Sequence, residues 1–271
     1  FAGTFDGQGH TISGLYLNAS ASNQGLFAKT GSDAVIKDLY LKNSYLNVSG
    51  KSYTSLGSIA GVAEGGTFEK VFSNAFVMGG CNRVGGLIGA TQYHPITMRE
   101  CAFAGSARIN DQASYLGGLI GQTQDGGKIE NCMNIGEVYH TFSGTLNTAA
   151  VGGFIGSVQG EAVSISDSVN HSDAQYTSGN YIGLIVGLNQ STVTMTNCHS
   201  ILYRYANNAT KNLIGNPAAN PAGCTRQNKA DVAGDKSLTV ANVSNLFTSE
   251  SAKGHWVCSD DSLPVLAVFA E

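Results

Sequence analysis

The stretch Val84-Gly85-Gly86-Leu87-Ile88-Gly89 decides the fold of this 271-residue chain, because close copies of it recur along almost the whole sequence. Seven copies end at residues 28, 61, 89, 121, 156, 187 and 215, at intervals of 28 to 35 residues. A period of this length indicates one supersecondary unit stacked many times, not a globular core of unrelated elements.

A second phrase recurs with the same period but out of phase with the first. In most copies it places an apolar residue between polar neighbours, as in Thr67-Phe68-Glu69-Lys70-Val71 and Lys128-Ile129-Glu130-Asn131-Cys132. This alternation is typical of a half-buried strand, and the glycine-bounded apolar phrase is typical of a short buried strand. Frequent Gly, Ser, Thr and Asn disfavour helices throughout.

One position of the second phrase predicts a sharp corner in each repeat. It carries Asp38, Lys70, Glu100, Asn131, Asp167 and Asn197. Asn and Asp accept the left-handed backbone conformation more readily than other residues that have a side chain. Stacked copies would place these side chains one above another, where amides can hydrogen-bond along the stack.

Five of the six cysteines fall into two groups, and Cys81 has no obvious disulfide partner in the sequence. Three of them share one column of the repeat, in which other copies carry Leu39, Val71 and Ser168; they are Cys101, Cys132 and Cys198. That column favours small or apolar inward side chains, so these three are expected to be buried free thiols. Cys224 and Cys258 lie outside the recognised repeat and could bridge a C-terminal coil. The redox compartment therefore stays open.

The economical architecture is an all-β, single-stranded parallel β-helix whose coils pair at a spacing of about 4.8 Å. Residues 1–216 are expected to form an array of about seven to eight coils. The period breaks after Asn216, and prolines follow at Pro217 and Pro221. Residues 217–271 are therefore expected to form an irregular last coil and C-terminal cap of the same domain.

The bulk composition argues against several classes of protein. A net charge of −4 provides no basic field for nucleic acid or for an anionic membrane surface. No apolar run reaches the roughly eighteen residues of a membrane span, so no membrane insertion is expected. The chain opens at Phe1 in a strand-like pattern without a signal peptide, and we interpret it as a fragment of a larger protein.

Two stretches of the sequence resemble those of known protein families. Phe5-Asp6-Gly7-Gln8-Gly9-His10-Thr11-Ile12 resembles the first coil of pectate-lyase-like right-handed β-helices. The glycine phrase, with its copies at Gly117 and Gly152, resembles the GLUG motif. The resemblance implies right-handed coiling and an extracellular or surface-attached bacterial protein, such as an adhesin or the non-catalytic region of an IgA-specific metallopeptidase. It brings no catalytic residue set with it.

Motifs of several catalytic classes are missing from the sequence. There is no His-Glu-x-x-His, Gly-x-Ser-x-Gly, phosphate-binding loop or Cys-x-x-Cys, so no metal and no cofactor are expected. Glu100, Glu130 and Asp167 come from consecutive repeats, and a glycosidase would need two carboxylates at roughly 5–10 Å. A turn column beside a solvated face explains these three more simply.

Rings in the segments between the repeated strands are the best candidates for ligand contact. The candidate residues are Tyr93, His94, Tyr139, His140, Tyr203 and Tyr205. Rings on loops can stack on sugars or peptides. The alternative is that they cover corners and seal the columns of the core.

The sequence as a whole predicts a surface-exposed structural or adhesive β-helix module, with a host or dietary glycan or glycoprotein as its partner. One alternative is a carbohydrate-active β-helix, either a glycosidase or a polysaccharide lyase. A second is a mechanical spacer without a ligand. Whether the chain is an enzyme stays open, with the motifs favouring a non-catalytic role, and the ligand, the anchor and the oligomeric state are also undetermined.

Overall fold

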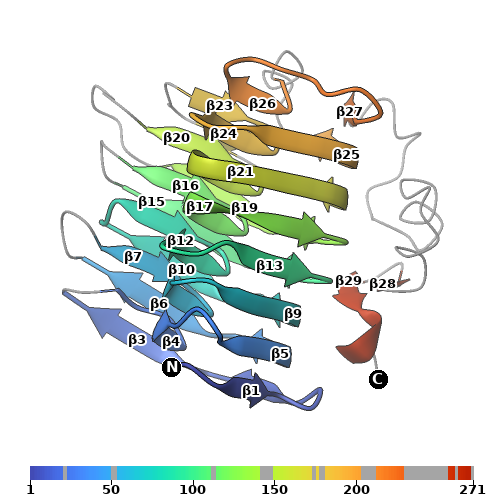
Figure 1. Cartoon of the computed structure of the whole chain (residues 1–271). Helices are drawn as coiled ribbons and strands as arrows, with labels where there is room; N and C mark the ends of the chain where they lie inside the picture. The colour runs from blue at the N-terminus through green and yellow to red at the C-terminus, as the bar shows by residue number, and fades with distance from the viewer. Residues whose placement is uncertain are drawn as a thin grey trace.

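The computed structural model describes residues 1–20, 23–49, 54–110, 114–140, 149–172, 175–176, 181–202, 212–228, 256–259 and 262–269. Through these residues the chain winds into a parallel β-solenoid of about six turns (Figure 1), which confirms the predicted all-β architecture. The predicted seven to eight coils are slightly too many. Seven copies of the glycine phrase bound only six intervals, and each copy occupies only part of a turn.

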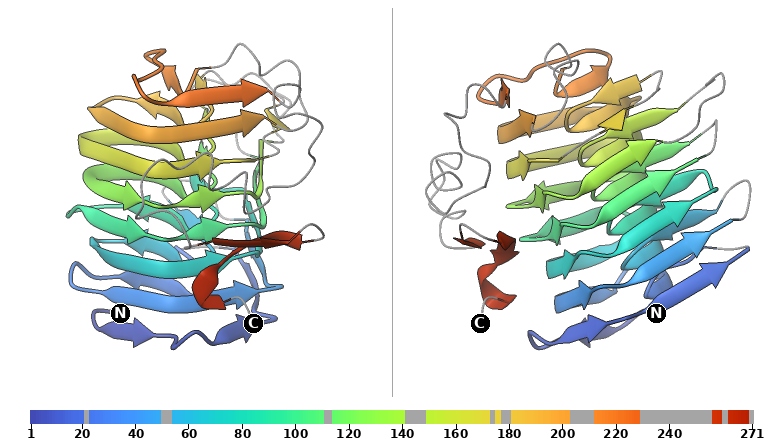
Figure 2. Two further views of the ribbon diagram at one scale, coloured as in Figure 1. Left: turned by 90° about the vertical axis from the view of Figure 1, so that its right-hand side faces the viewer. Right: turned by 180° about the vertical axis from the view of Figure 1, so that it is seen from behind.

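Two of the sheets of the solenoid run along its length as continuous stacks (Figures 1 and 2). The six-stranded sheet consists of β3 (Tyr16–Ala19), β6 (Tyr45–Val48), β10 (Phe76–Gly79), β15 (Ser106–Ile109), β19 (Glu137–His140) and β22 (Gln175–Tyr176). The five-stranded sheet consists of β7 (Ser55–Gly57), β11 (Arg83–Gly85), β16 (Tyr115–Gly117), β20 (Ala150–Gly152) and β23 (Tyr181–Gly183).

The third and largest sheet has sixteen strands, because long strands bend around a corner of the solenoid and join two of its faces. Its strands are β1 (Thr4–Asp6), β2 (Thr11–Ser13), β4 (Phe27–Thr30), β5 (Val35–Lys42), β8 (Ala60–Ala63), β9 (Gly66–Ser73), β12 (Ile88–Thr91), β13 (Ile96–Arg99), β14 (Ala102–Phe103), β17 (Ile120–Glu130), β18 (Met133–Asn134), β21 (Ile155–Asn170), β24 (Val186–Asn189), β25 (Val193–Leu202), β26 (Ile214–Asn216) and β27 (Thr225–Asn228).

The glycine phrase forms the tight connection from β11 to β12 and its counterparts in other turns. A methyl group on Gly85 would lie 1.9 Å from the carbonyl oxygen of Ile88, and one on Gly86 would lie 2.0 Å from the carbonyl oxygen of Gly118. The close approach of backbones therefore leaves no room for a side chain at these two glycines, while Leu87 and Ile88 fill the core. The position of Gly85 is accordingly glycine in every copy of the phrase except the last, whereas the position of Gly86 is Ser58 or Leu184 in two of them.

The predicted corner column is confirmed. All six of its residues have φ angles between 49° and 53°, in the left-handed region: Asp38, Lys70, Glu100, Asn131, Asp167 and Asn197. The expected hydrogen bonding along the stack occurs at its far end, where Asn197 Nδ2 donates to Asp167 Oδ1 at 2.8 Å.

The cysteine column is also confirmed, and it extends one turn further than expected. Cys101, Cys132 and Cys198 are reduced and fully buried. Strand β27 pairs with β25 so that Cys224 falls beside Cys198, and Cys224 is likewise reduced. Placing Cys224 outside the repeat was therefore wrong, because the residues flanking it no longer show the repeated phrase. The side chain of Cys258 lies outside the described residues.

The C-terminal strands lie beside the stack (Figures 1 and 2). Strands β28 (Trp256–Ser259) and β29 (Ser262–Leu266) form an antiparallel hairpin, followed by the 3-10 helix η2 (Ala267–Phe269). Leu266 is buried in a small apolar cluster with Phe72, Ala102, Met133, Ile135 and Val169. The hairpin thus covers apolar side chains on one side of the solenoid. The division of the chain at residue 216 stays a prediction.

Candidate binding surface

The outer face of the six-stranded sheet carries a column of aromatic rings. Tyr16, Tyr45 and Phe76 are register partners in β3, β6 and β10. The ring centroids of Tyr16 and Tyr45 are 5.5 Å apart with an interplanar angle of 14°, and those of Tyr45 and Phe76 are 5.5 Å apart at 3°. The rings therefore form a nearly parallel stack along the solenoid.

Arg108 of β15 continues this stack with a guanidinium plane. Its Cζ lies 5.1 Å from the ring centroid of Phe76 and 5.5 Å from that of Tyr139, both within cation–π range. One of its NH2 groups donates to Glu137 Oε2 at 3.1 Å, and its Nε donates to Ser106 Oγ at 2.9 Å. These contacts fix the position of the side chain between its neighbours on the sheet.

A second outward column runs beside the aromatic one, two residues further along each strand. It contains Asn18, Asn47, Met78, Arg108 and Tyr139 in register. Asn47 Nδ2 donates to Asn18 Oδ1 at 2.8 Å. Each amide can form more hydrogen bonds than this one, so the pair places polar donors and acceptors next to the rings. We call the two columns together the aromatic face.

The aromatic face follows from strand alternation. In β6, Leu46 and Val48 are fully buried, whereas Tyr45 and Asn47 between them are only partly buried. Successive side chains of a strand point to opposite sides of a sheet. An aromatic residue followed by a buried aliphatic one therefore puts the ring outside in β3, β6 and β10. Tyr16 is the most exposed of the rings on this face, with 70% of its surface accessible.

The structure places the predicted candidates in different environments. Tyr139 belongs to the aromatic face, whereas His140, the next residue, faces inward and is fully buried, with its Nε2 3.2 Å from Ser114 Oγ. Tyr93 and His94 are exposed on the corner between β12 and β13, where the Tyr93 N–H donates to Asp125 Oδ2 at 2.5 Å. They are therefore not brought together with Tyr139. Tyr203 and Tyr205 lie outside the described residues.

Sequence reasoning missed Tyr16, Tyr45, Phe76 and Arg108. A signal was present, because Tyr16-Leu17-Asn18, Tyr45-Leu46-Asn47 and Phe76-Val77-Met78 form a third phrase at steps of 29 and 31 residues. That phrase is shorter than the glycine phrase, and its third copy already replaces Tyr and Asn. It is recognisable only when the turns are aligned by the other two phrases.

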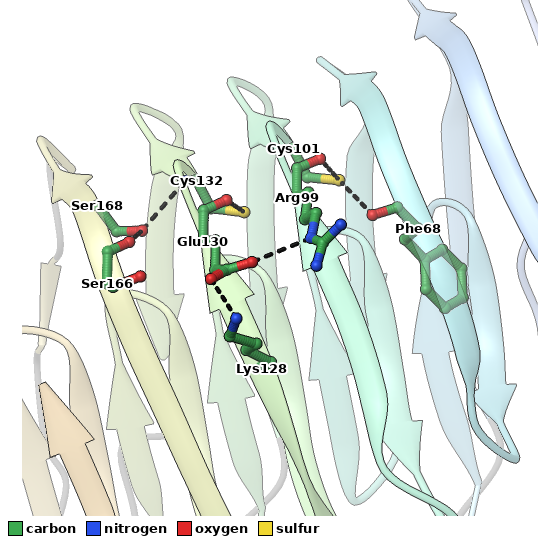
Figure 3. A network of polar contacts seen from close by, with 8 residues as sticks. All are labelled: Phe68, Arg99, Cys101, Lys128, Glu130, Cys132, Ser166 and Ser168. Carbon is green, nitrogen blue, oxygen red and sulfur yellow. Dashed lines mark hydrogen bonds and ion pairs between the residues drawn. The ribbon is translucent and has the colours of Figure 1, made fainter. Parts of the chain in front are cut away.

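The candidate carboxylates lie elsewhere, and Glu130 is held in an ion-pair network (Figure 3). Its carboxylate accepts from Arg99 Nε at 3.0 Å and from Lys128 Nζ at 2.5 Å. Partial burial acts to raise the pKa of Glu130, but the hydrogen bonds from Lys128 and Arg99 outweigh it and lower the pKa. A glycosidase acid needs the opposite shift, so this carboxylate is suited to an ion pair at neutral pH.

The described residues offer no candidate for two other kinds of site. Among the described residues, no group of three or more His, Cys, Asp or Glu side chains is arranged to hold a metal ion. The same part of the chain contains no helix with the length and apolar character needed to cross a membrane.

Comparison with known proteins agrees with this architecture. The family model that describes the GLUG motif matches residues 112–139 of the sequence. Halomucin of Haloquadratum walsbyi strain DSM 16790 / HBSQ001 is 37% identical over 103 residues, which is 38% of this chain but 1% of Halomucin. The chain thus spans only a very small part of the length of this relative.

A solved structure shows the same fold. The crystal structure of a "putative immunoglobulin A1 protease" from Bacteroides ovatus superposes with a TM-score of 0.71 over 97% of this chain and 77% of that chain, at 17% identity. At this identity the likeness concerns the fold alone. The chain is therefore a parallel β-solenoid that carries the GLUG motif, as its repeated glycine phrase predicted.

Proposed function

We propose that this chain is a module of an extracellular, cell-surface protein and that it binds a glycan or glycoprotein on its aromatic face. The observation that supports this most strongly is the outward stack of Tyr16, Tyr45 and Phe76, which continues into Arg108. A ring with 70% of its surface accessible, as in Tyr16, leaves apolar area in water that a partner can cover.

The chemistry of the aromatic face fits a sugar. The C–H-rich faces of sugar rings pack on aromatic rings, while their hydroxyl groups need hydrogen-bonding partners beside them. The amides of Asn18 and Asn47 supply donors and acceptors two residues along the strands from Tyr16 and Tyr45. The face extends over successive turns of the solenoid, which suits an extended chain better than a small enclosed ligand.

Surface location is part of the proposal. It rests on the local similarity to Halomucin, whose name describes a mucin, and on the resemblance of the glycine phrase to the GLUG motif of bacterial surface proteins. A host or dietary glycan is the kind of partner that such a location would present.

The test is binding of the whole chain to an array of glycans and mucins, with Tyr16→Ala and Tyr45→Ala variants. Each variant is expected to weaken binding by about tenfold, the equivalent of one aromatic contact. Tyr93→Ala is the matched control, because Tyr93 is similarly exposed but lies on a corner outside the aromatic face. Circular dichroism checks that the fold is retained.

Three outcomes would contradict the proposal. Loss of binding in Tyr93→Ala but not in Tyr16→Ala would indicate that the ligand binds at the corner between β12 and β13 instead. Release of cleaved sugar would indicate a carbohydrate-active enzyme. No binding to any glycan would favour a spacer, for which the continuous backbone pairing from β3 to β22 already provides a stiff rod.

A further inference from the structure

Cys198 and Cys224 lie side by side in the last two turns of the cysteine column. Strands β25 and β27 pair in parallel with His199 opposite Thr225, and the two cysteines directly precede these residues. The Cys198 N–H donates to Cys224 Sγ at 3.4 Å. Neighbouring strands are about 4.8 Å apart, within the 4.4–6.8 Å Cα separation that a disulfide spans.

The two thiols differ in access to solvent. Cys198 is fully buried, and its Sγ lies 3.3 Å from the carbonyl oxygens of both Ile165 and Thr196. Cys224 is only partly buried and packs at the margin of the core. A reagent in solution can therefore reach Cys224 first.

The contact between the two thiols also shifts their pKa values in opposite directions. The hydrogen bond that Cys224 forms with Cys198 lowers the pKa of Cys224 to about 6, although partial burial acts in the opposite direction. The same contact is the main cause that raises the pKa of Cys198, and burial raises it further. At neutral pH the accessible sulfur is thus a thiolate, which is the nucleophilic form of cysteine.

We propose that Cys198 and Cys224 form a redox site in which Cys224 is the attacking thiol and Cys198 the resolving thiol. The oxidant is a small disulfide such as oxidised glutathione. The product is a disulfide that joins β25 to β27. This site is separate from the aromatic face and does not depend on glycan binding.

The reaction proceeds in two exchange steps. The Cys224 thiolate attacks one sulfur of oxidised glutathione, forms a mixed disulfide and releases one glutathione thiolate, which takes the proton of Cys198. The charge that opposed ionisation of Cys198 is then gone, so its thiolate attacks Cys224 Sγ and releases the second glutathione. The second glutathione leaves as a thiolate and takes a proton from water, equivalent to the one that Cys224 released when it ionised. In total the two protein thiols lose two electrons and two protons, and one glutathione disulfide becomes two glutathione thiols.

A second cysteine pair provides an internal control. Ala102 and Met133 are register partners, so Cys101 and Cys132, which directly precede them, are also neighbours in adjacent turns. Both are fully buried, and burial, together with the neighbouring Cys101, raises the pKa of the Cys132 thiol. The same spacing without access should leave this pair reduced in the folded protein.

The expected consequence of oxidation is a firmer last turn. Among the described strands, β27 pairs only with β25. A covalent link at Cys198 and Cys224 would hold that strand in place, and we expect the melting temperature to rise by about 5 °C.

The experiment treats the whole folded chain with oxidised glutathione at neutral pH, blocks remaining thiols, and maps the products by mass spectrometry. Digestion with trypsin and chymotrypsin separates Cys198 from Cys132. The expected product is a Cys198–Cys224 cross-link with Cys101 and Cys132 still reduced. Alkylation of Cys224 should reach half its maximal rate near pH 6.

Two variants make the roles distinguishable. Cys198→Ser should trap one glutathione on Cys224, because the resolving thiol is missing, whereas Cys224→Ser should give neither the adduct nor the cross-link. The proposal is overturned if Cys224 instead pairs with Cys258, if Cys101 and Cys132 oxidise equally fast, or if Cys198→Ser accumulates no adduct. A melting temperature that rises on oxidation and returns on reduction would support the clamping of β27.

Discussion

The side-chain amide of Asn134 donates to Asn170 Oδ1 at 3.0 Å, one turn further along the solenoid. The same Nδ2 donates to the carbonyl oxygen of Gly153 at 2.8 Å. Asn170 repeats the arrangement by donating to the carbonyl oxygen of Leu184 at 2.7 Å. Both side chains are buried, so this amide ladder satisfies backbone carbonyls of the glycine phrase inside the core.

Replacing Asn134 by alanine should lower the free energy of unfolding by about 2–3 kcal/mol. The change leaves the Gly153 carbonyl and Asn170 Oδ1 without this donor in a site that water does not reach. Urea denaturation measures the loss. The control is Asn47→Ala, which removes an exposed amide contact on the aromatic face and should cost less than about 0.5 kcal/mol. Equal losses in the two variants would contradict a structural role for the buried ladder.

Gly86→Ala should destabilise the solenoid by about 3 kcal/mol, because its new methyl group would overlap the Gly118 carbonyl oxygen at 2.0 Å and the Phe103 ring at 2.4 Å. Thermal unfolding measures the effect. Gly80→Ala is the matched control, since its nearest neighbour is the Asn110 side chain at 3.3 Å. A Gly86→Ala protein as stable as the parent would show that the phrase is not required by backbone contact.

Lys70→Asn should stabilise the chain by about 0.5–1 kcal/mol. Lys70 has a φ of 52°, and asparagine accepts this left-handed conformation at lower cost than lysine. Chemical denaturation would record a higher midpoint with an unchanged slope. The same change at Lys42, an exposed strand residue outside the corner column, should be neutral or slightly destabilising. A gain at Lys42 as well would point to a charge effect instead.

The protein should become less stable as the pH falls from about 6.5 to about 4, because of His171. Burial lowers its pKa from 6.5 to about 4, so the unfolded state takes up the proton first. The contribution of neutral His171 to the free energy of unfolding is fully present above pH 6.5, and up to about 3 kcal/mol of it is lost by pH 4. His171→Gln should flatten the pH dependence of the melting temperature over this interval. An unchanged pH profile in the variant would show that His171 is protonated at the same pH in both states.

The sequence by itself determined the period, the strand alternation and the corners. The first glycine of the repeated phrase, as at Gly85, is required locally, because a side chain there would strike the backbone of its own turn. The corner residues were likewise predictable from residue type, and all six have left-handed φ angles. The burial of Cys101, Cys132 and Cys198 followed from their shared column. A repeat encodes these features many times over, so single departures do not hide them.

Only the tertiary structure decided how distant segments meet. Cys224 entered the cysteine column because β27 pairs with β25, although its own flanking sequence no longer carries the phrase. Leu266 packs beside Phe72 across nearly two hundred residues of chain, a contact that no local pattern specifies. The ring stack from Tyr16 to Phe76 exists only once the turns are in register. Backbone conformation and side-chain alternation depend on neighbours in sequence, whereas a binding surface and a thiol pair depend on which turns the hydrogen-bonded stack brings together.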